Sequence, residues 1–199
     1  MAFLLLSLHF CWSSVAAQRG SGKPAYTASK AAAEQCNLKL KNLENFAAKR
    51  KSGQKQTTRF LEGEVNSYLA LDLSLKYHPC LKSLVMTFEE NAMQAVAAID
   101  FDRLGNTSIK FLPKLISFMF SGTHTLTAQG QLLSKNGYAN FHLEKARFDN
   151  STLPKSLVEE IITAVGRKQN PPFDPLQPSE MPYGIKEVDV HPGYIIVYQ

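Results

Sequence analysis

The chain has 199 residues, of which 44% are hydrophobic and 20% charged, and its formal net charge at pH 7 is +5. This is the composition of an ordinary globular protein, and the length suits one domain with a sizeable core. The sequence holds no internal repeat and no low-complexity segment, so repeat arrays and low-complexity chains are excluded.

The first seventeen residues have the features of an export signal. Phe3 to Val15 form an apolar run, and Val15-Ala16-Ala17 is a small-residue cleavage pattern, so we expect a signal peptide over 1–17. The run is too short to span a bilayer comfortably. An apolar tail that precedes the true start of the protein is the alternative. Residues 18–27 contain Gly, Ser and Pro, so we expect a flexible lead-in there. We expect residues 28–199 to form a single domain.

Without the signal, the chain keeps two cysteines, Cys36 and Cys80. An exported protein can form a disulfide between them, and closing that loop would contribute roughly 3–4 kcal/mol in the chain-entropy model. Cys36 also fits as a small buried apolar residue on a helix face. No histidine stands at ligand spacing from either cysteine, so we expect no metal site.

A long amphipathic helix is expected from Thr27 to Lys51, capped by Thr27 or Ser29. Its apolar residues recur every three or four positions and its lysines fill the other face. A strand and a second helix follow, and Glu62 and Glu64 lie in the first turn of that helix, where its dipole favours anions. Two alternating strands come next. The expected ranges are Gln56–Phe60 (strand), Leu61–Leu71 (helix), Leu81–Phe88 (strand) and Met93–Asp102 (strand).

The clearest pattern is a β-hairpin from Thr123 to Phe148. Asn136-Gly137 at its centre suits a tight turn with two positive φ angles. Leu126, Ala128, Gly130 and Leu132 share one face of the first arm. In the second arm the apolar phase slips near Glu144, which predicts a β-bulge and a curved sheet.

The segment just before this hairpin, Phe111 to Phe120, is apolar almost all round. Such a segment is either fully buried or meets lipid or a partner. After the hairpin the pattern predicts a helix at Pro154–Arg167, a proline-rich connection and a last hairpin, Ile185–Val190 with Tyr194–Tyr198. Together these elements predict an α+β fold: one curved antiparallel sheet, wrapped against the long first helix and also covered by the Pro154 helix.

The sequence contains no motif that supports catalysis. Nucleophile elbows, phosphate loops, paired metal ligands and dinucleotide fingerprints are all missing from it, so we expect no enzymatic activity and no cofactor. His124 and His142 lie on the two arms of the main hairpin and could be neighbours, which is more often structural than catalytic. A one-sided curved sheet without a catalytic cluster favours binding by enclosure.

Positive charge gathers near the start of the predicted domain. Residues 18–59 hold ten Lys and Arg against two Asp and Glu, whereas residues 60–199 hold twelve against fifteen. The basic run from Lys49 to Arg59 would attract anions. In an exported protein these are phospholipid head groups or acidic glycans, not nucleic acid. A solvated helix end and loop is the alternative.

Three motifs resemble one protein family. They are Glu62-Gly63-Glu64-Val65-Asn66 at a helix start, Leu153-Pro154 before a helix, and Met181-Pro182-Tyr183-Gly184-Ile185 before the last hairpin. Together with the main hairpin they resemble the LmeA-like phospholipid-binding proteins of the tubular lipid-binding (TULIP) group, over Thr57 to Gln199. The resemblance implies an exported protein in which a curved sheet grips a long helix and holds acyl chains, and it carries over no catalytic residue. Leu61 departs from the family's usual Ser or Thr cap, and Met181 replaces its usual Leu.

We therefore expect a non-catalytic protein of the cell envelope, periplasmic or extracellular, that binds or shuttles a phospholipid or another amphiphile. Its acyl chains would lie between sheet and first helix, with the Phe111–Phe120 segment at the mouth. The alternative is an envelope interaction or assembly protein with a filled core, and for each apolar residue the alternative is plain core. The predicted lipid contacts are Leu40, Leu43, Leu84, Met86, Ile99, Leu115, Phe118, Met119, Leu126, Ala128, Gly130, Leu132, Phe141 and Leu143. The predicted contacts to an anionic membrane surface are Lys49, Arg50, Lys51, Lys55 and Arg59.

Overall fold

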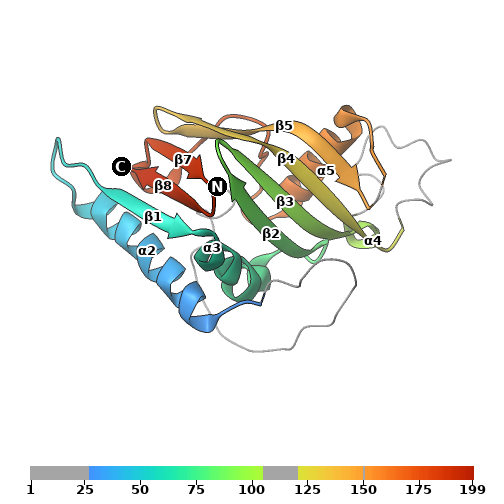
Figure 1. Ribbon diagram of the computed structural model, residues 1–199, viewed down its shortest axis with the longest axis horizontal. Coiled ribbons are helices and arrows are strands. Elements are labelled where there is room, and N and C mark those ends of the chain that lie inside the picture. Colours follow the sequence, from blue (N-terminus) through green and yellow to red (C-terminus); the bar gives the residue numbers. More distant parts are fainter. Residues whose placement is uncertain (1–26, 105–120, 150) are drawn as a thin grey trace.

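The computed structural model describes residues 27–104, 121–149 and 151–199, and it has an α+β fold with two antiparallel sheets (Figure 1). The larger sheet is curled into a half-barrel and has the strand order β2-β3-β4-β5-β6. The smaller sheet has the order β1-β8-β7. The strands are β1 (Thr57–Leu61), β2 (Leu81–Glu89), β3 (Ala92–Asp100), β4 (Thr123–Lys135), β5 (Tyr138–Phe148), β6 (Ser179–Glu180), β7 (Glu187–His191) and β8 (Tyr194–Tyr198).

The helices lie against these sheets in two groups. One group lies at the smaller sheet and at the β2 edge of the larger one, and α5 lies along the larger sheet (Figure 1). The α-helices are α2 (Lys30–Lys49), α3 (Glu62–Tyr68), α4 (Phe101–Leu104) and α5 (Lys155–Lys168). The α3 helix continues as a π-helical turn, η1 (Leu69–Leu73), and a 3₁₀ turn, η2 (Ser74–Lys76), and a further 3₁₀ turn, η5, spans Pro182–Gly184.

The expected curved sheet is confirmed, but the expectation of a single sheet is wrong. The last hairpin, β7-β8, does not extend the larger sheet. Instead β8 pairs with β1, in a register that joins Thr57 to Tyr198 and Leu61 to Tyr194. The first strand of the domain, β1, thus pairs with the last strand of the chain, β8. This long-range pairing produces the second, smaller sheet.

The main hairpin has the predicted turn and the predicted bulge. Asn136 and Gly137 have φ angles of 52° and 90°, as a tight two-residue turn requires. Gln129 pairs with Lys145, whereas Gly130 pairs with Leu143, so Glu144 is the extra residue of a bulge. The bulge bends the strand pair and returns the apolar side chains to the concave face.

The Glu62–Asn66 motif attaches α3 to the edge of the larger sheet. The Asn66 side chain donates to the Met86 carbonyl oxygen and accepts from the Met86 N–H, both at 2.7 Å. A carboxylate oxygen of Glu62 accepts from the Phe88 N–H at 2.7 Å. Because β2 is an edge strand, its N–H and C=O groups would otherwise be open to pairing with another chain. The motif therefore has a structural role at this edge.

Helix α2 lies within the predicted range but is shorter, Lys30–Lys49, and it packs elsewhere. Ser29 caps it by accepting from the Ala32 N–H at 3.4 Å. Its apolar stripe packs on α3, β1 and η5, and Lys39 forms a 2.6 Å ion pair with the buried Glu64 of α3. Since α2 lies on the smaller sheet and on α3, the prediction that the curved sheet wraps this helix is wrong.

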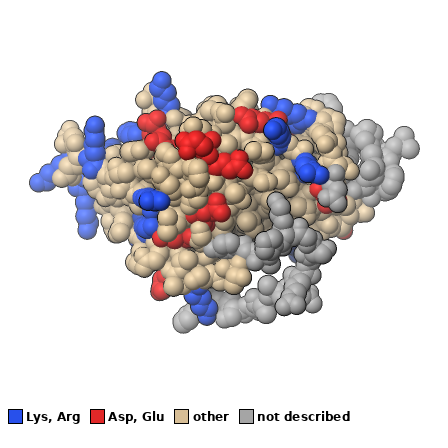
Figure 2. Space-filling view, in the orientation of Figure 1, with Lys and Arg blue, Asp and Glu red and all other residues tan. Residues whose placement is uncertain are grey.

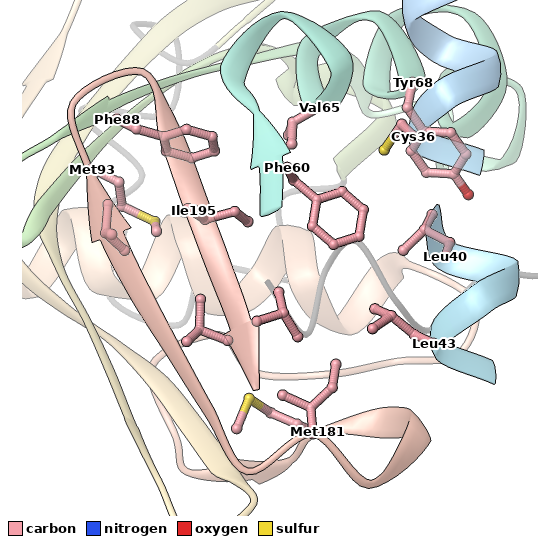
Figure 3. Close-up of a cluster of buried hydrophobic side chains, with 14 of the residues drawn as sticks. Cys36, Leu40, Leu43, Phe60, Val65, Tyr68, Phe88, Met93, Met181 and Ile195 are labelled. Atoms are coloured by element: carbon pink, nitrogen blue, oxygen red, sulfur yellow. The ribbon is translucent and has the colours of Figure 1, made fainter. Parts of the chain in front are cut away.

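Two separate hydrophobic cores result. The α2 core joins α2, α3 and the smaller sheet to the near end of the larger sheet, and its side chains point toward one another in Figure 3. The α5 core joins α4 and α5 to the far end of the larger sheet. The α2 core is centred on Cys36, Leu40, Leu43, Phe60, Val65, Tyr68, Phe88, Met93, Met181 and Ile195. The α5 core is centred on Cys80, Leu81, Ile99, Phe101, Leu126, Leu143, Phe148, Val158 and Ile161.

The two cysteines belong to different cores. Cys36 lies in the α2 core and Cys80 in the α5 core, and both are buried and unbridged. Of the two alternatives left open by the sequence, the structure does not contain the disulfide and has Cys36 as a small buried apolar residue. Burial raises the pKa of the Cys36 thiol to about 12, so it stays protonated at physiological pH.

Candidate functional site

The concave face of the larger sheet has a row of small side chains across its middle. Ala95 of β3 pairs with Ala128 of β4, and Ala128 pairs with Ala146 of β5. We call these three residues the alanine row. The neighbouring rows on the same face also carry large side chains: Leu126 and Phe148 accompany Ala97 on one side, and Met93 and Leu143 accompany Gly130 on the other. Because side chains on a strand alternate between the two faces, the row forms a trough bounded by larger residues.

A cavity of about 140 Å³ lies over Ala95 and Ala128 of this trough and is partly open to solvent, and Ala146 is not among its lining residues. Its wall comprises strands β2 to β5, and its cover comprises α5, the η1 turn and Pro175. Every lining residue is apolar. They are Leu69, Leu81, Leu84, Met86, Phe88, Met93, Ala95, Ala97, Ile99, Leu126, Ala128, Leu132, Phe141, Ile162, Val165 and Pro175.

The cavity occupies the gap between the two cores. Phe88 and Met93, buried in the α2 core, close one end. Ile99 and Leu126, buried in the α5 core, close the other. Between them most lining side chains, such as Ala95 and Ala97, are half-buried, whereas Ala128 is 6% exposed and belongs to the α5 core. The sheet is therefore covered at both ends and less covered in the middle.

Seven of the predicted lipid contacts line this cavity. They are Leu84, Met86, Ile99, Leu126, Ala128, Leu132 and Phe141. Three further predicted contacts, Leu115, Phe118 and Met119, lie outside the described residues, as does the whole Phe111–Phe120 segment.

Four predicted lipid contacts are placed elsewhere. Leu40 and Leu43 are buried in the α2 core, because α2 does not cover the larger sheet. Leu143 is 2% exposed and belongs to the α5 core. A Cβ atom on Gly130 would collide with the carbonyl oxygen of His142 on the neighbouring strand. Gly130 therefore permits close approach of the strands at the bulge and does not widen the cavity.

The contribution of α5 was missed from the sequence. Ile162 and Val165 lie one turn apart on this helix and face the cavity. The apolar side of the Pro154–Arg167 helix was visible as a pattern, but the pattern does not say which part of the sheet it covers. Leu69 likewise lies in the predicted Leu61–Leu71 helix without an indication of its partner, and Pro175 had no comparable signal.

The cavity lacks groups for chemistry. None of its lining side chains is titratable, and among the described residues no three His, Cys, Asp or Glu side chains gather as metal ligands. Such a surface can hold an apolar group, but it offers nothing to orient or activate a polar one.

The two histidines of the main hairpin are not neighbours. His142 pairs with Gln131, whereas His124 lies at the other end of the hairpin. The ring nitrogens of His124 lie 2.8 Å from a carboxylate oxygen of Asp149 and 2.9 Å from the Ser121 carbonyl oxygen. Burial raises the pKa of the Asp149 carboxyl, but hydrogen bonds from the Thr125 N–H and from His124 outweigh it and lower that pKa overall. These contacts join His124 to Ser121 and Asp149 at the end of the sheet.

The predicted basic residues lie away from the cavity. Lys49, Arg50, Lys51, Lys55 and Arg59 are all exposed, at the end of α2, in the following loop and in β1. Figure 2 shows Lys and Arg gathered at the left-hand end, where Figure 1 places the α2–β1 loop. None of the five lines the cavity, so they do not form its mouth.

Comparison with protein-family models, with curated proteins and with solved structures gives no match. Among the described residues, no helix is both long enough and apolar enough to cross a bilayer.

Proposed function

We propose that this protein is a non-catalytic carrier that binds the acyl chain of a lipid or another amphiphile over the alanine row. The observation that carries the proposal is the cavity, with its wholly apolar lining and its opening between two filled cores. A TULIP-like use of a curved sheet to hold acyl chains, with α5 and not α2 as its cover, belongs to the same proposal. So do the export of the protein and its place in the cell envelope. They are supported by the signal-like first residues and by the motifs that resemble the LmeA-like family.

The size of the cavity limits how much ligand it encloses. A dry apolar cavity of about 150 Å³ is known to bind benzene in another protein, so about 140 Å³ suits the end of an acyl chain. The remainder of the chain would extend through the opening. Burying a methylene contributes about 0.8 kcal/mol, so six enclosed methylenes contribute roughly 5 kcal/mol, and about ten are needed for micromolar affinity.

Native mass spectrometry of the purified protein, with solvent extraction of any bound molecule, tests the proposal. We expect a copurified amphiphile, or saturable binding of a fluorescent fatty acid once any bound lipid has been removed from the protein. A protein that is empty after mild purification and that binds no such probe would contradict the proposal. That outcome would favour an envelope assembly protein whose interior serves only as its core.

A further inference from the structure

A second depression lies at the basic end of the molecule, where the α2–β1 loop faces the start of β7 and the last residues of the chain. It has a volume of about 600 Å³. We call it the basic groove. Its lining residues are Arg50, Lys51, Ser52, Gly53, Gln54, Lys55, Gln56, Thr57, Lys186, Glu187, Tyr198 and Gln199.

The ionisable side chains of the basic groove are mainly cationic. Arg50, Lys51, Lys55 and Lys186 face a single acidic side chain, Glu187. Within the described part of the chain, the ion pairs involve other lysines and arginines and none of these four. Lys186 was not among the predicted basic residues, because it is distant in sequence and joins them only through the pairing of β8 with β1. The groove thus has an excess of positive side-chain charge, with four cations beside the one carboxylate of Glu187.

The loop that carries these cations is held in place from its base. The Lys51 N–H donates to the Gln54 side chain at 2.8 Å, and Gly53 supplies the positive φ of 82° that the turn needs. Backbone hydrogen bonds in both directions join Gln56 to Gln199, at 3.3 and 2.9 Å. The Gln199 side chain is buried and donates to the Leu43 carbonyl oxygen at 3.0 Å. The charges are therefore presented from an anchored loop at one end of the long axis (Figure 2).

We propose that the basic groove and the adjoining loop form a docking site for an anionic phospholipid membrane. The choice of a membrane as the anionic partner rests on the proposed function, since a lipid carrier must meet a membrane to exchange its ligand. Docking and ligand binding would occupy different parts of the molecule, because none of these cations lines the cavity. The groove would hold the protein at the surface and would not bind the head group of the carried lipid.

Each Lys or Arg near an anionic surface contributes about 1 kcal/mol, which corresponds to about a fivefold change in the partition coefficient. Neutralising two of them should therefore weaken membrane binding roughly 25-fold. The attraction should also fall with added salt, since exposed charges are screened over about 8–10 Å at physiological ionic strength.

Vesicle sedimentation can test this with the full chain after removal of any signal peptide. The probe is phosphatidylcholine vesicles with about one third phosphatidylglycerol, compared with pure phosphatidylcholine. The variant Lys51→Gln/Lys55→Gln removes two cations of the groove. The control Lys145→Gln/Arg147→Gln removes two exposed cations of β5. Fatty-acid probe binding is measured on every variant, and heparin serves as a soluble polyanion competitor.

We expect salt-sensitive binding to the anionic vesicles only. The partition coefficient should fall roughly 25-fold in the groove variant and change by no more than about twofold in the control. Probe binding should be unchanged in both. Equal losses in the two variants, or tight heparin binding without vesicle binding, would overturn the docking proposal. Normal vesicle docking by a protein that binds no fatty acid would instead contradict the proposed carrier function alone.

Discussion

The α2 core and the alanine row are both apolar and both lie against strands, but they are filled to different extents. In the α2 core, Leu40 and Leu43 of the helix meet Phe60 of β1, and each is at most 2% exposed. Over the alanine row the sheet supplies only methyl groups, and α5 approaches with Ile162 and Val165. The first region has the dense packing expected of a protein interior. The second leaves about 140 Å³ unfilled.

Under the proposed function the two regions have different roles. An empty apolar volume forfeits contacts that would stabilise the fold, so it persists where larger side chains would interfere with something else. We attribute it to ligand binding. Substitutions at α2-core positions that do not line the cavity, such as Leu43, should then affect stability and leave ligand affinity unchanged. Substitutions at a half-buried cavity position such as Ala95 should mainly affect ligand affinity.

The largest effect on stability is expected for Leu43→Ala. Leu43 is fully buried in the α2 core, and large-to-small changes at such positions cost about 2–5 kcal/mol through lost transfer energy and an unfilled cavity. Urea denaturation measures the loss, and the fatty-acid affinity of the folded fraction should not change. Leu38→Ala, on the half-exposed side of the same helix, is the control. A marked drop in fatty-acid affinity would mean that the two regions are not separate.

Gly130→Ala should have the next largest effect and lower the free energy of unfolding by about 2–3 kcal/mol. The added Cβ collides with the backbone of His142, and relieving that overlap requires the strands to separate at the bulge. Gln129→Ala, one residue away on the opposite face of β4, should be nearly neutral. If Gly130→Ala were as stable as the wild type in urea, the bulge would tolerate more space than the structure gives it.

Asn66→Ala should cost about 1–2 kcal/mol, because it leaves the Met86 N–H and carbonyl without their partners at the edge of β2. Hydrogen exchange of the β2 amides should accelerate, since the α3 attachment to this edge is lost. The same substitution at the exposed Asn45 of α2 tests for a general effect. Unchanged protection of β2 would show that the edge does not depend on α3.

Asp149→Asn should have the smallest effect, since the carboxylate is 48% exposed. Hydrogen bonds lower the pKa of this group in the folded protein, so its contribution to stability is present above the unfolded pKa and is lost as the pH falls through the folded value. The stability difference between wild type and variant should therefore shrink on acidification below pH of about 4. Thermal melts over an acidic pH series measure it, and a difference that grew toward low pH would contradict the assignment.

The sequence predicted the local structure well because its signals are local. Asn136-Gly137 defines a turn through its own backbone preferences, and the phase slip near Glu144 marks a bulge by alternation alone. The stripe on α2 predicted a packed helix for the same reason. None of these patterns says what a surface packs against.

The long-range arrangement was correspondingly hard to predict. The pairing of Thr57 with Tyr198 joins residues from opposite ends of the domain. Because of this pairing, α2 lies on the smaller sheet and Lys186 lies beside the α2–β1 loop, and neither position can be inferred from the adjacent sequence. Seven cavity residues were predicted because alternation assigned them to the concave face. Gly130 was misassigned because a missing side chain can either widen a cavity or admit a neighbouring strand.

The most direct test of the central claim compares Ala128→Phe with Ala98→Phe. Ala128 lines the cavity, whereas Ala98 lies on the convex face of β3. The two substitutions therefore add the same volume inside the cavity and on the opposite face of the sheet. Ala95→Phe, at a half-buried position of the row, is a second inside variant in case Ala128→Phe folds poorly. The measurement is the dissociation constant of a fluorescent fatty acid.

We predict that the inside variants weaken binding at least tenfold, because excluding even two methylenes removes about 1.6 kcal/mol. The Ala98→Phe control should stay within about twofold of the wild type. Equal affinity for all four proteins, each folded by urea denaturation, would contradict the claim that the alanine row is a ligand site.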